Sequence, residues 1–105
     1  MEIDSTELER LLESGEKVLL VDVRQPWEHE IARLSGSTLI PLPEFPARAG
    51  EIQPAPGQRV VCYCHHGLRS LQAAQFLRAA GIDALSLRGG IDAWSQIVDP
   101  KTPRY

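Results

Sequence analysis

Two short runs of apolar and β-branched residues constrain the fold of this chain more than any other feature. Residues 17–23 and 59–63 are almost continuously apolar, so neither run alternates as a strand with one face in water would. Runs of this kind are typical of strands that helices cover on both faces. Parallel strands have this environment, because the crossover that joins two of them usually contains a helix.

Helical segments occur around these two runs. Asp4 can cap a helix, and leucines recur at helical spacing until Gly15, which predicts a helix over residues 5–14. Residues 70–80 show a second helical apolar face, which ends at Gly81. A short helix is predicted from Pro26, with Trp27 and Ile31 toward the core. We also expect strands at 38–40 and 84–87 and an irregular connection over 41–57. A turn at Gly89-Gly90 precedes a last helical face, which is formed by Ile91, Trp94 and Val98.

The order of these elements predicts an α/β fold. We expect a mostly parallel central sheet of about four or five strands, flanked by helices on both faces. The 105 residues and the hydrophobic content of 43% suit one compact core, so we expect a single domain over residues 1–105, with 98–105 as a C-terminal tail. Ligands of such sheets bind at the carboxyl ends of the strands.

The overall charge and the apolar content exclude several classes of protein. The chain has 11 Lys and Arg against 14 Asp and Glu, with neither sign collected in a block, which argues against a nucleic-acid partner. The longest apolar stretch, residues 18–21, is far too short to cross a membrane. Two cysteines are too few for a disulfide framework and suit a reducing compartment. We therefore expect a soluble, cytoplasmic protein.

Cys64 lies at the junction between the predicted strand 59–63 and the helix that follows. At such a place, unpaired backbone N–H groups and the positive end of the helix dipole favour a thiolate. Gly67 allows the intervening loop to curl, so that its amides converge on the Cys64 sulfur. Arg69 can tie loop carbonyls in place or meet an anionic substrate, and Ser70 can cap the helix or donate a hydrogen bond inward. We therefore predict that Cys64 is a nucleophile.

The loop Cys64-His65-His66-Gly67-Leu68-Arg69-Ser70 resembles the active-site loop of single-domain rhodaneses through its Cys-x-x-Gly-x-Arg-Ser pattern. Other motifs similar to those of that family occur in the order it has: Leu20-Val21-Asp22-Val23-Arg24 with Glu28, Ser35-Gly36, Ile40-Pro41, and Gly89-Gly90-Ile91-Asp92-Ala93-Trp94. Several separated motifs in order are more specific than any one of them. Residues 98–105 also resemble the end of rhodanese modules attached to enzymes that activate sulfur-carrier proteins.

The resemblance implies a rhodanese-like fold and a sulfurtransferase activity. Cys64 would take a sulfane sulfur from thiosulfate or a protein persulfide, and a thiol, cyanide or a sulfur-carrier protein would accept it from the Cys64 persulfide. No metal or organic cofactor is required. The substrate-binding loop would comprise His65, His66, Gly67, Leu68, Arg69 and Ser70. We interpret Asp22, Arg24 and Glu28 as an ion-paired support beneath this loop.

The same residues allow other interpretations, which the sequence favours less. Cys62 lies within the predicted strand, so we expect it to pack as a small hydrophobic side chain and not to act as a resolving cysteine. Residues 62–66 crowd their Cys and His side chains too closely for a tetrahedral zinc site. Cys-dependent phosphatases and arsenate reductases of this architecture use a loop one residue longer, which makes them a minor alternative. A persulfide-binding or interaction module without free turnover is the alternative from another class.

Overall fold

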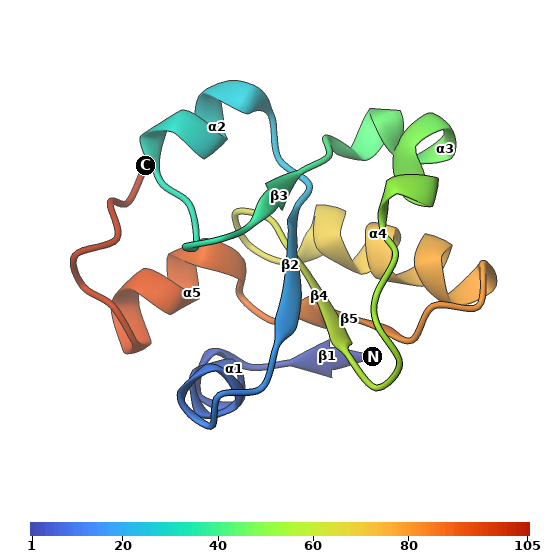
Figure 1. The fold of residues 1–105 in the computed structure, drawn as a ribbon. Coiled ribbons are helices and arrows are strands. Elements are labelled where there is room, and N and C mark those ends of the chain that lie inside the picture. Colours follow the sequence, from blue (N-terminus) through green and yellow to red (C-terminus); the bar gives the residue numbers. More distant parts are fainter.

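The computed structural model describes all 105 residues of the chain, which form a parallel sheet with helices on both faces (Figure 1). The sheet has the strand order β1-β5-β4-β2-β3, and every neighbouring pair is parallel. This confirms the predicted α/β class and the predicted parallel sheet. The strands are β1 (Glu2–Ile3), β2 (Val18–Asp22), β3 (Thr38–Leu39), β4 (Arg59–Tyr63) and β5 (Ala84–Leu87).

Helices of very different lengths connect the strands. They are α1 (Ser5–Glu13), α2 (Pro26–Ile31), α3 (Phe45–Arg48), α4 (Leu68–Ala79) and α5 (Gly90–Ile97), with 3-10 turns at η1 (Leu42–Glu44) and η2 (Ala49–Glu51). Residues 41–57, predicted to be irregular throughout, thus contain η1, α3 and η2. Pro43 and Pro46 are the second residues of η1 and α3, where a missing N–H costs nothing because it lies in a first helical turn. None of the helices has the length and apolar character needed to cross a membrane.

The two apolar runs form the central strands β2 and β4. These strands pair along their whole length, from Val18 opposite Arg59 to Asp22 opposite Tyr63. Their carboxyl ends therefore lie side by side at one edge of the sheet. The segments that follow Asp22 and Tyr63 meet there, which is where parallel sheets bind their ligands.

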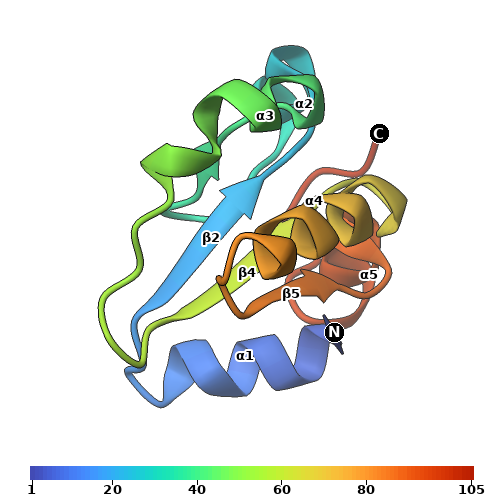
Figure 2. The ribbon, with the colours of Figure 1, turned by 90° about the vertical axis from the view of Figure 1, so that its right-hand side faces the viewer.

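The core has two layers, one on each face of the sheet. On one face α4 buries Ala73 and Leu77 against the sheet, and Figure 2 shows this helix lying along β4 and β5. On the other face α1 and α5 contribute Leu8, Ile91 and Trp94 to a second buried cluster. Because both faces are covered, the central strands are apolar without alternation, as the sequence indicated.

The first helix begins where the sequence predicts. The Asp4 side chain accepts a hydrogen bond from the Glu7 amide at 2.8 Å, and the Glu7 side chain accepts one from the Asp4 amide at 3.3 Å, which together make a capping box. The preceding strand β1 was not predicted. It pairs with Ser86 and Leu87 of β5, and its two residues are too few to carry a periodic signal.

The prediction that Trp27 and Ile31 face the core is wrong. Trp27 is 57% exposed and Ile31 is 43% exposed. Residues four apart share one face of a helix, so the spacing was interpreted correctly, but that face of α2 turns to solvent. The buried face of α2 is polar and carries Glu28, which is held by hydrogen bonds described below.

The helix after Cys64 begins at Leu68, two residues before the predicted start at residue 70. Gly67 is its N-cap and has a left-handed backbone conformation with φ of 109°, which favours glycine. Leu68 and Arg69 therefore belong to the first turn of α4. The loop between Cys64 and the helix is shorter than the sequence suggested.

Candidate active site

Cys64 follows directly on β4, and its sulfur faces the first turn of α4. The Cys64 Sγ accepts hydrogen bonds from the Gly67 amide at 3.1 Å and from the Ser70 amide at 3.4 Å. These amides lie at a helix N-terminus, where N–H groups lack intrahelical partners and the positive end of the helix dipole is located. The sulfur therefore occupies a position that stabilises a negative charge.

One buried serine lies next to this sulfur, and a second buried serine contacts the first. The Ser70 hydroxyl is 3.4 Å from the Cys64 Sγ and 2.8 Å from the Ser86 hydroxyl on β5. It also donates to the Gly67 carbonyl at 3.3 Å. Of the two roles considered for Ser70, the side chain thus adopts the inward one. Ser86 was missed, because no motif or spacing connects it to the loop.

Four other amides of this segment donate no hydrogen bond within the protein. They belong to His65, His66, Leu68 and Arg69. Backbone amides grouped in this way around a loop form a binding site for anions. Because the backbone fixes them, these dipoles need little reorganisation when charge develops on a nearby atom.

The N-terminus of α5 holds the other side of the loop. The amides of Ile91 and Asp92 donate to the carbonyls of Cys64 and His65 at 2.9 and 3.1 Å. This contact requires a glycine at position 90, where φ is 62° and a Cβ atom would lie 2.5 Å from the Cys64 carbonyl oxygen. Gly90 is thus the first residue of α5 as well as part of the predicted turn. Its lack of a side chain allows the backbone of α5 to approach the backbone of the Cys64 loop closely.

Contact with an anionic substrate stays a prediction for Arg69, but its side chain forms no hydrogen bond with a loop carbonyl, the other role that the sequence suggests for it. Its guanidinium forms a two-bond ion pair with Glu28, with Nη1 2.6 Å from Oε1 and Nη2 3.0 Å from Oε2. The Glu28 side chain is almost fully buried, whereas Arg69 is partly exposed. The pair connects the first turn of α4 to α2, so it joins two elements that border the Cys64 loop.

Glu28 is held in its charged form by this environment. Burial alone would raise the pKa of its carboxyl group, but hydrogen bonds from Arg69, the Gln25 amide and Tyr105 outweigh burial and lower the pKa to about 2. The hydrogen bonds with Glu28 in turn raise the pKa of Arg69. The two groups therefore neutralise each other across the whole physiological pH range.

Asp22 and Arg24 form a second ion pair, which is fully buried at the carboxyl end of β2. Arg24 Nε and Nη2 donate to the two Asp22 carboxylate oxygens at 2.8 and 2.7 Å. Asp22 also contacts His29 Nδ1 at 2.7 Å and accepts a hydrogen bond from the Tyr63 hydroxyl at 3.2 Å. The three residues expected to form one ion-paired support, Asp22, Arg24 and Glu28, thus belong to two separate ion pairs. Glu28 pairs with Arg69 and not with Arg24.

The two histidines of the loop lie at its rim. Their rings are stacked with centroids 4.0 Å apart, and the His65 ring stacks on its other side against Tyr105 at 4.2 Å. Burial, and then the neighbouring His66, lower the pKa of His65 and favour its neutral form. The exposed Leu68 side chain completes this rim. Tyr105 was not predicted as a site residue, because no local pattern indicates that the C-terminal segment returns to the loop.

Cys62 packs inside the sheet and differs from Cys64 in its surroundings. Its side chain is fully buried, and burial, followed by the neighbouring Cys64, raises its pKa to about 12. Both cysteines are free thiols, with no disulfide between them. Nowhere in the chain do three or more His, Cys, Asp or Glu side chains lie close enough together to hold a metal ion.

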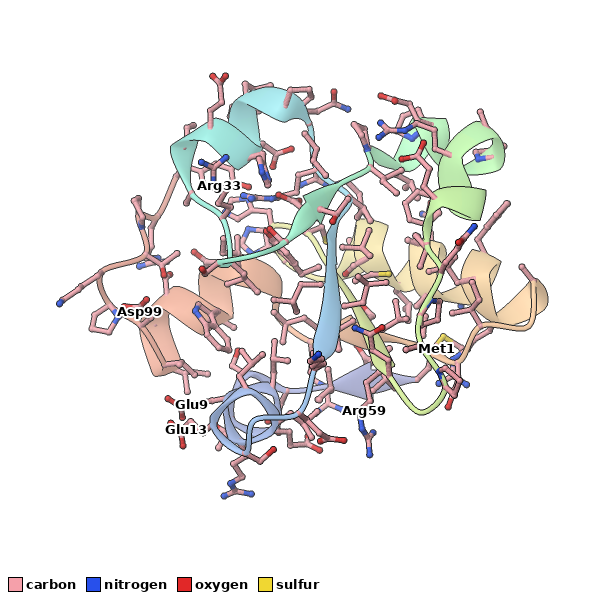
Figure 3. All side chains as sticks on the ribbon, viewed as in Figure 1. Met1, Glu9, Glu13, Arg33, Arg59 and Asp99 are labelled. Atoms are coloured by element: carbon pink, nitrogen blue, oxygen red, sulfur yellow. The ribbon has the colours of Figure 1, made fainter.

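Access to Cys64 is narrow. The residue is 1% exposed, and it lines none of the surface cavities of the protein. The largest cavity, of about 390 Å³, lies at the amino ends of the strands, where Figure 3 shows Arg59. That cavity is at the far end of the sheet from Cys64. A reactant must therefore present a small group to the sulfur.

Comparison with known proteins gives a consistent family assignment. The family model for the Rhodanese-like domain matches residues 4–97. A sulfurtransferase from Allochromatium vinosum is 42% identical over 97 residues, which cover 90% of this chain and 88% of that protein. A probable adenylyltransferase/sulfurtransferase MoeZ from Mycobacterium tuberculosis is 36% identical over 98% of this chain, but the chain spans only 26% of the length of that relative.

Solved structures show the same fold. A rhodanese-like domain protein from Staphylococcus aureus has a TM-score of 0.83 at 28% identity, with 100% of this chain and 99% of that chain covered. A thiosulfate sulfurtransferase from Pseudomonas aeruginosa has a TM-score of 0.84 at 26% identity, and the match covers 98% of this chain and 20% of that one. The architecture is therefore shared along the whole chain.

The close approach at Gly90 predicts a specific effect of adding a methyl group. Gly90→Ala should destabilise the protein by about 2–4 kcal/mol, because its Cβ atom would overlap the carbonyls of the Cys64 loop in addition to straining the backbone. Gly57→Ala is the matched control, since Gly57 also has a positive φ of 78° but no atom near the position of a Cβ. Urea unfolding measures both, and equal losses of stability would contradict the steric explanation.

The lowered pKa of Glu28 predicts a loss of stability in acid. The folded-state pKa lies below the ordinary value of 4.5, so the contribution of Glu28 is fully present above pH 4.5 and is lost as the pH falls through about 2. Between pH 5 and pH 3, the unfolding free energy of wild type should therefore fall by about 1–3 kcal/mol more than that of Glu28→Gln. Denaturant unfolding at pH 5 and pH 3 gives this difference. Identical pH dependence of the two proteins would argue against a charged, hydrogen-bonded Glu28.

Proposed function

Because the chain belongs to the family of rhodanese-like domains, we propose that it is a sulfurtransferase that carries a sulfane sulfur on Cys64 as a persulfide. The observation that supports this most directly is the contact of the Cys64 sulfur with the Gly67 and Ser70 amides. Donors at this position stabilise a thiolate before transfer and a persulfide anion after it. The chemistry needs no metal or organic cofactor.

In the first half-reaction the Cys64 thiolate attacks the outer sulfur of the donor. With thiosulfate, a bond forms between the Cys64 Sγ and that sulfur, the sulfur–sulfur bond of thiosulfate breaks, and sulfite leaves with the bonding electron pair. With a protein persulfide as donor, the leaving group is the thiolate of the partner. Both donors yield the same Cys64 persulfide, and neither reaction needs an external oxidant or reductant.

In the second half-reaction an acceptor nucleophile attacks the outer sulfur of the persulfide. The new bond forms between the acceptor and that sulfur, and the Cys64 thiolate leaves with the electron pair of the broken bond. Cyanide as acceptor would give thiocyanate, and a thiol would give a new persulfide. The resemblance of residues 98–105 to modules of sulfur-carrier-activating enzymes suggests a sulfur-carrier protein as a third acceptor. The enzyme returns to its starting state, so the kinetics should be of the ping-pong type.

Negative charge stays close to the loop throughout this cycle. It resides on Cys64, then on the outer sulfur, then again on Cys64. The unpaired amides of His65, His66, Leu68 and Arg69 offer hydrogen bonds along this short path. Arg69 contributes little net charge, because Glu28 pairs with it. The proposed anion stabilisation therefore comes from the backbone and from the dipole of α4.

The narrow access to Cys64 favours a second candidate, a module that receives sulfur from a partner and does not turn over freely. Cys64 is 1% exposed, so a partner protein that presents its sulfur at the end of a slender chain fits the site well. Both candidates use the same persulfide. They differ in whether thiosulfate and cyanide alone sustain repeated cycles.

A phosphatase or arsenate-reductase activity is not supported by the arrangement of the loop. Arginine usually binds a phosphate or a similar oxyanion through two parallel N–H donors. Arg69 already uses both Nη groups on Glu28. The loop of four residues between Cys64 and Arg69 also remains one residue shorter than such enzymes have.

The two cysteines give a matched test of the proposal. Treatment with thiosulfate should add the mass of one sulfur atom to wild type and to Cys62→Ala, and a reductant should remove it. Cys64→Ala should gain no such mass and should produce no thiocyanate from cyanide, because it lacks the attacking sulfur. Intact-mass spectrometry and a thiocyanate assay measure these outcomes. An adduct that persists in Cys64→Ala would refute the assignment of the nucleophile.

The same experiment separates the two candidates. Steady formation of thiocyanate from thiosulfate and cyanide supports a freely acting sulfurtransferase. A sulfur adduct that forms from a low-molecular-weight persulfide, without thiocyanate formation from thiosulfate and cyanide, supports the partner-dependent module. Failure of both donors to load Cys64 would contradict both.

A further inference from the structure

The C-terminal segment returns to the active-site loop and places Tyr105 between this loop and α2. Figure 1 shows this segment running from the end of α5 toward α2. The Tyr105 ring is stacked on His65 with an angle of 13° between the ring planes, and it meets the Trp27 ring edge-on at 5.9 Å. Tyr105 is thus in contact with both the Cys64 loop and α2.

The Tyr105 hydroxyl joins the two ion pairs of the site. It accepts a hydrogen bond from Arg24 Nη1 at 2.8 Å and donates one to Glu28 Oε2 at 2.6 Å. No other side chain bonds to both Arg24 and Glu28. A continuous chain of hydrogen bonds therefore runs from the buried Asp22–Arg24 pair through Tyr105 to Glu28 and Arg69.

Both hydrogen bonds of this hydroxyl have a definite direction. Arg24 can only donate, so the phenol oxygen must accept from it. The ionised Glu28 can only accept, so the phenol proton must point to it. Burial, followed by the hydrogen bond to Glu28, raises the pKa of Tyr105 to about 12, so the proton stays on the phenol. The link is therefore intact at any pH at which the protein would work.

We propose that Tyr105 is a positioning residue for sulfur transfer, which holds Glu28 and, through Glu28, fixes Arg69 in the first turn of α4. This inference rests on the proposed function of Cys64. The same turn carries the Ser70 amide that faces the Cys64 sulfur. Fixing Arg69 to α2 therefore limits movement of the donors that stabilise the sulfur anion. The contact of the Tyr105 ring with His65 limits movement of that histidine as well.

Tyr105→Phe tests this role, because it removes the two hydrogen bonds and keeps the ring. The rate of Cys64 persulfidation by thiosulfate, measured in a single turnover, should fall about tenfold, the effect expected when a hydrogen bond to a charged group no longer orients the site. Arg104→Ala is the control within the same segment. It breaks only the exposed pair between Arg104 and Asp92, so its rate should stay within about twofold of wild type.

Coupling to Glu28 separates positioning from a general loss of structure. If Tyr105 acts through Glu28, adding Tyr105→Phe to Glu28→Ala should lower the persulfidation rate by less than about twofold, because the alanine side chain offers no acceptor and the link is already broken. If the two effects multiply, Tyr105 acts independently of Glu28 and the proposal is wrong. A Tyr105→Phe protein that does not fold, or one with a rate within about twofold of wild type, also overturns it.

Two readouts by NMR do not require turnover. The His65 ring-proton shifts should stay near their wild-type values in Tyr105→Phe, which shows that the aromatic ring remains stacked on His65. The exchange of the Arg69 guanidinium protons with solvent should become faster, because Glu28 holds them less firmly. If wild type accepts no sulfur but Arg69 exchange becomes faster in Tyr105→Phe, the proposed function fails while the Tyr105 link stands. Unchanged Arg69 exchange means that Tyr105 does not position Arg69.

Discussion

The contact between the N-terminus of α5 and the Cys64 loop is the constraint on which the rest of the site depends. The Ile91 and Asp92 amides hold the carbonyls of Cys64 and His65. In a trans peptide the C=O and the following N–H point in opposite directions, and the chain has no cis peptide bond. Fixing these two carbonyls toward α5 therefore turns the amides of His65 and His66 away from it, which leaves them free for an anion.

Local patterns made the fold and the position of Cys64 between β4 and α4 predictable, whereas the long-range contacts of the site were not predictable. The apolar runs of β2 and β4 and the strand-to-helix position of Cys64 depend on neighbouring residues, so the sequence indicates them directly. Tyr105 and Ser86 join the site through contacts with residues far away in the chain, for which no pattern exists. The α2 helix shows a different limit, because apolar spacing identifies a helical face but not whether that face or a polar one is buried.

The pairing of Arg69 with Glu28 changes how the site handles charge. Thiosulfate is a dianion, and a free arginine near Cys64 would attract it strongly. Here the Arg69 charge is balanced by Glu28, whose pKa is lowered to about 2, so in the proposed reaction the backbone dipoles would supply most of the attraction. Backbone dipoles act over a shorter range than a net charge. This arrangement stabilises one anionic sulfur atom in contact with the loop better than it attracts a dianion from solution.

The burial of Cys64 fits the transfer of a single atom. A sulfur–sulfur bond is about 2 Å long, so the persulfide that we propose would extend the reactive end of Cys64 by that distance. The rim is exposed, with Leu68 at 78% exposure, whereas Cys64 itself is 1% exposed. An acceptor would thus need to reach only the outer sulfur and not Cys64. The same burial hinders a bulky thiol from forming a mixed disulfide with Cys64, because its sulfur would have to enter the space that one added sulfur atom fills.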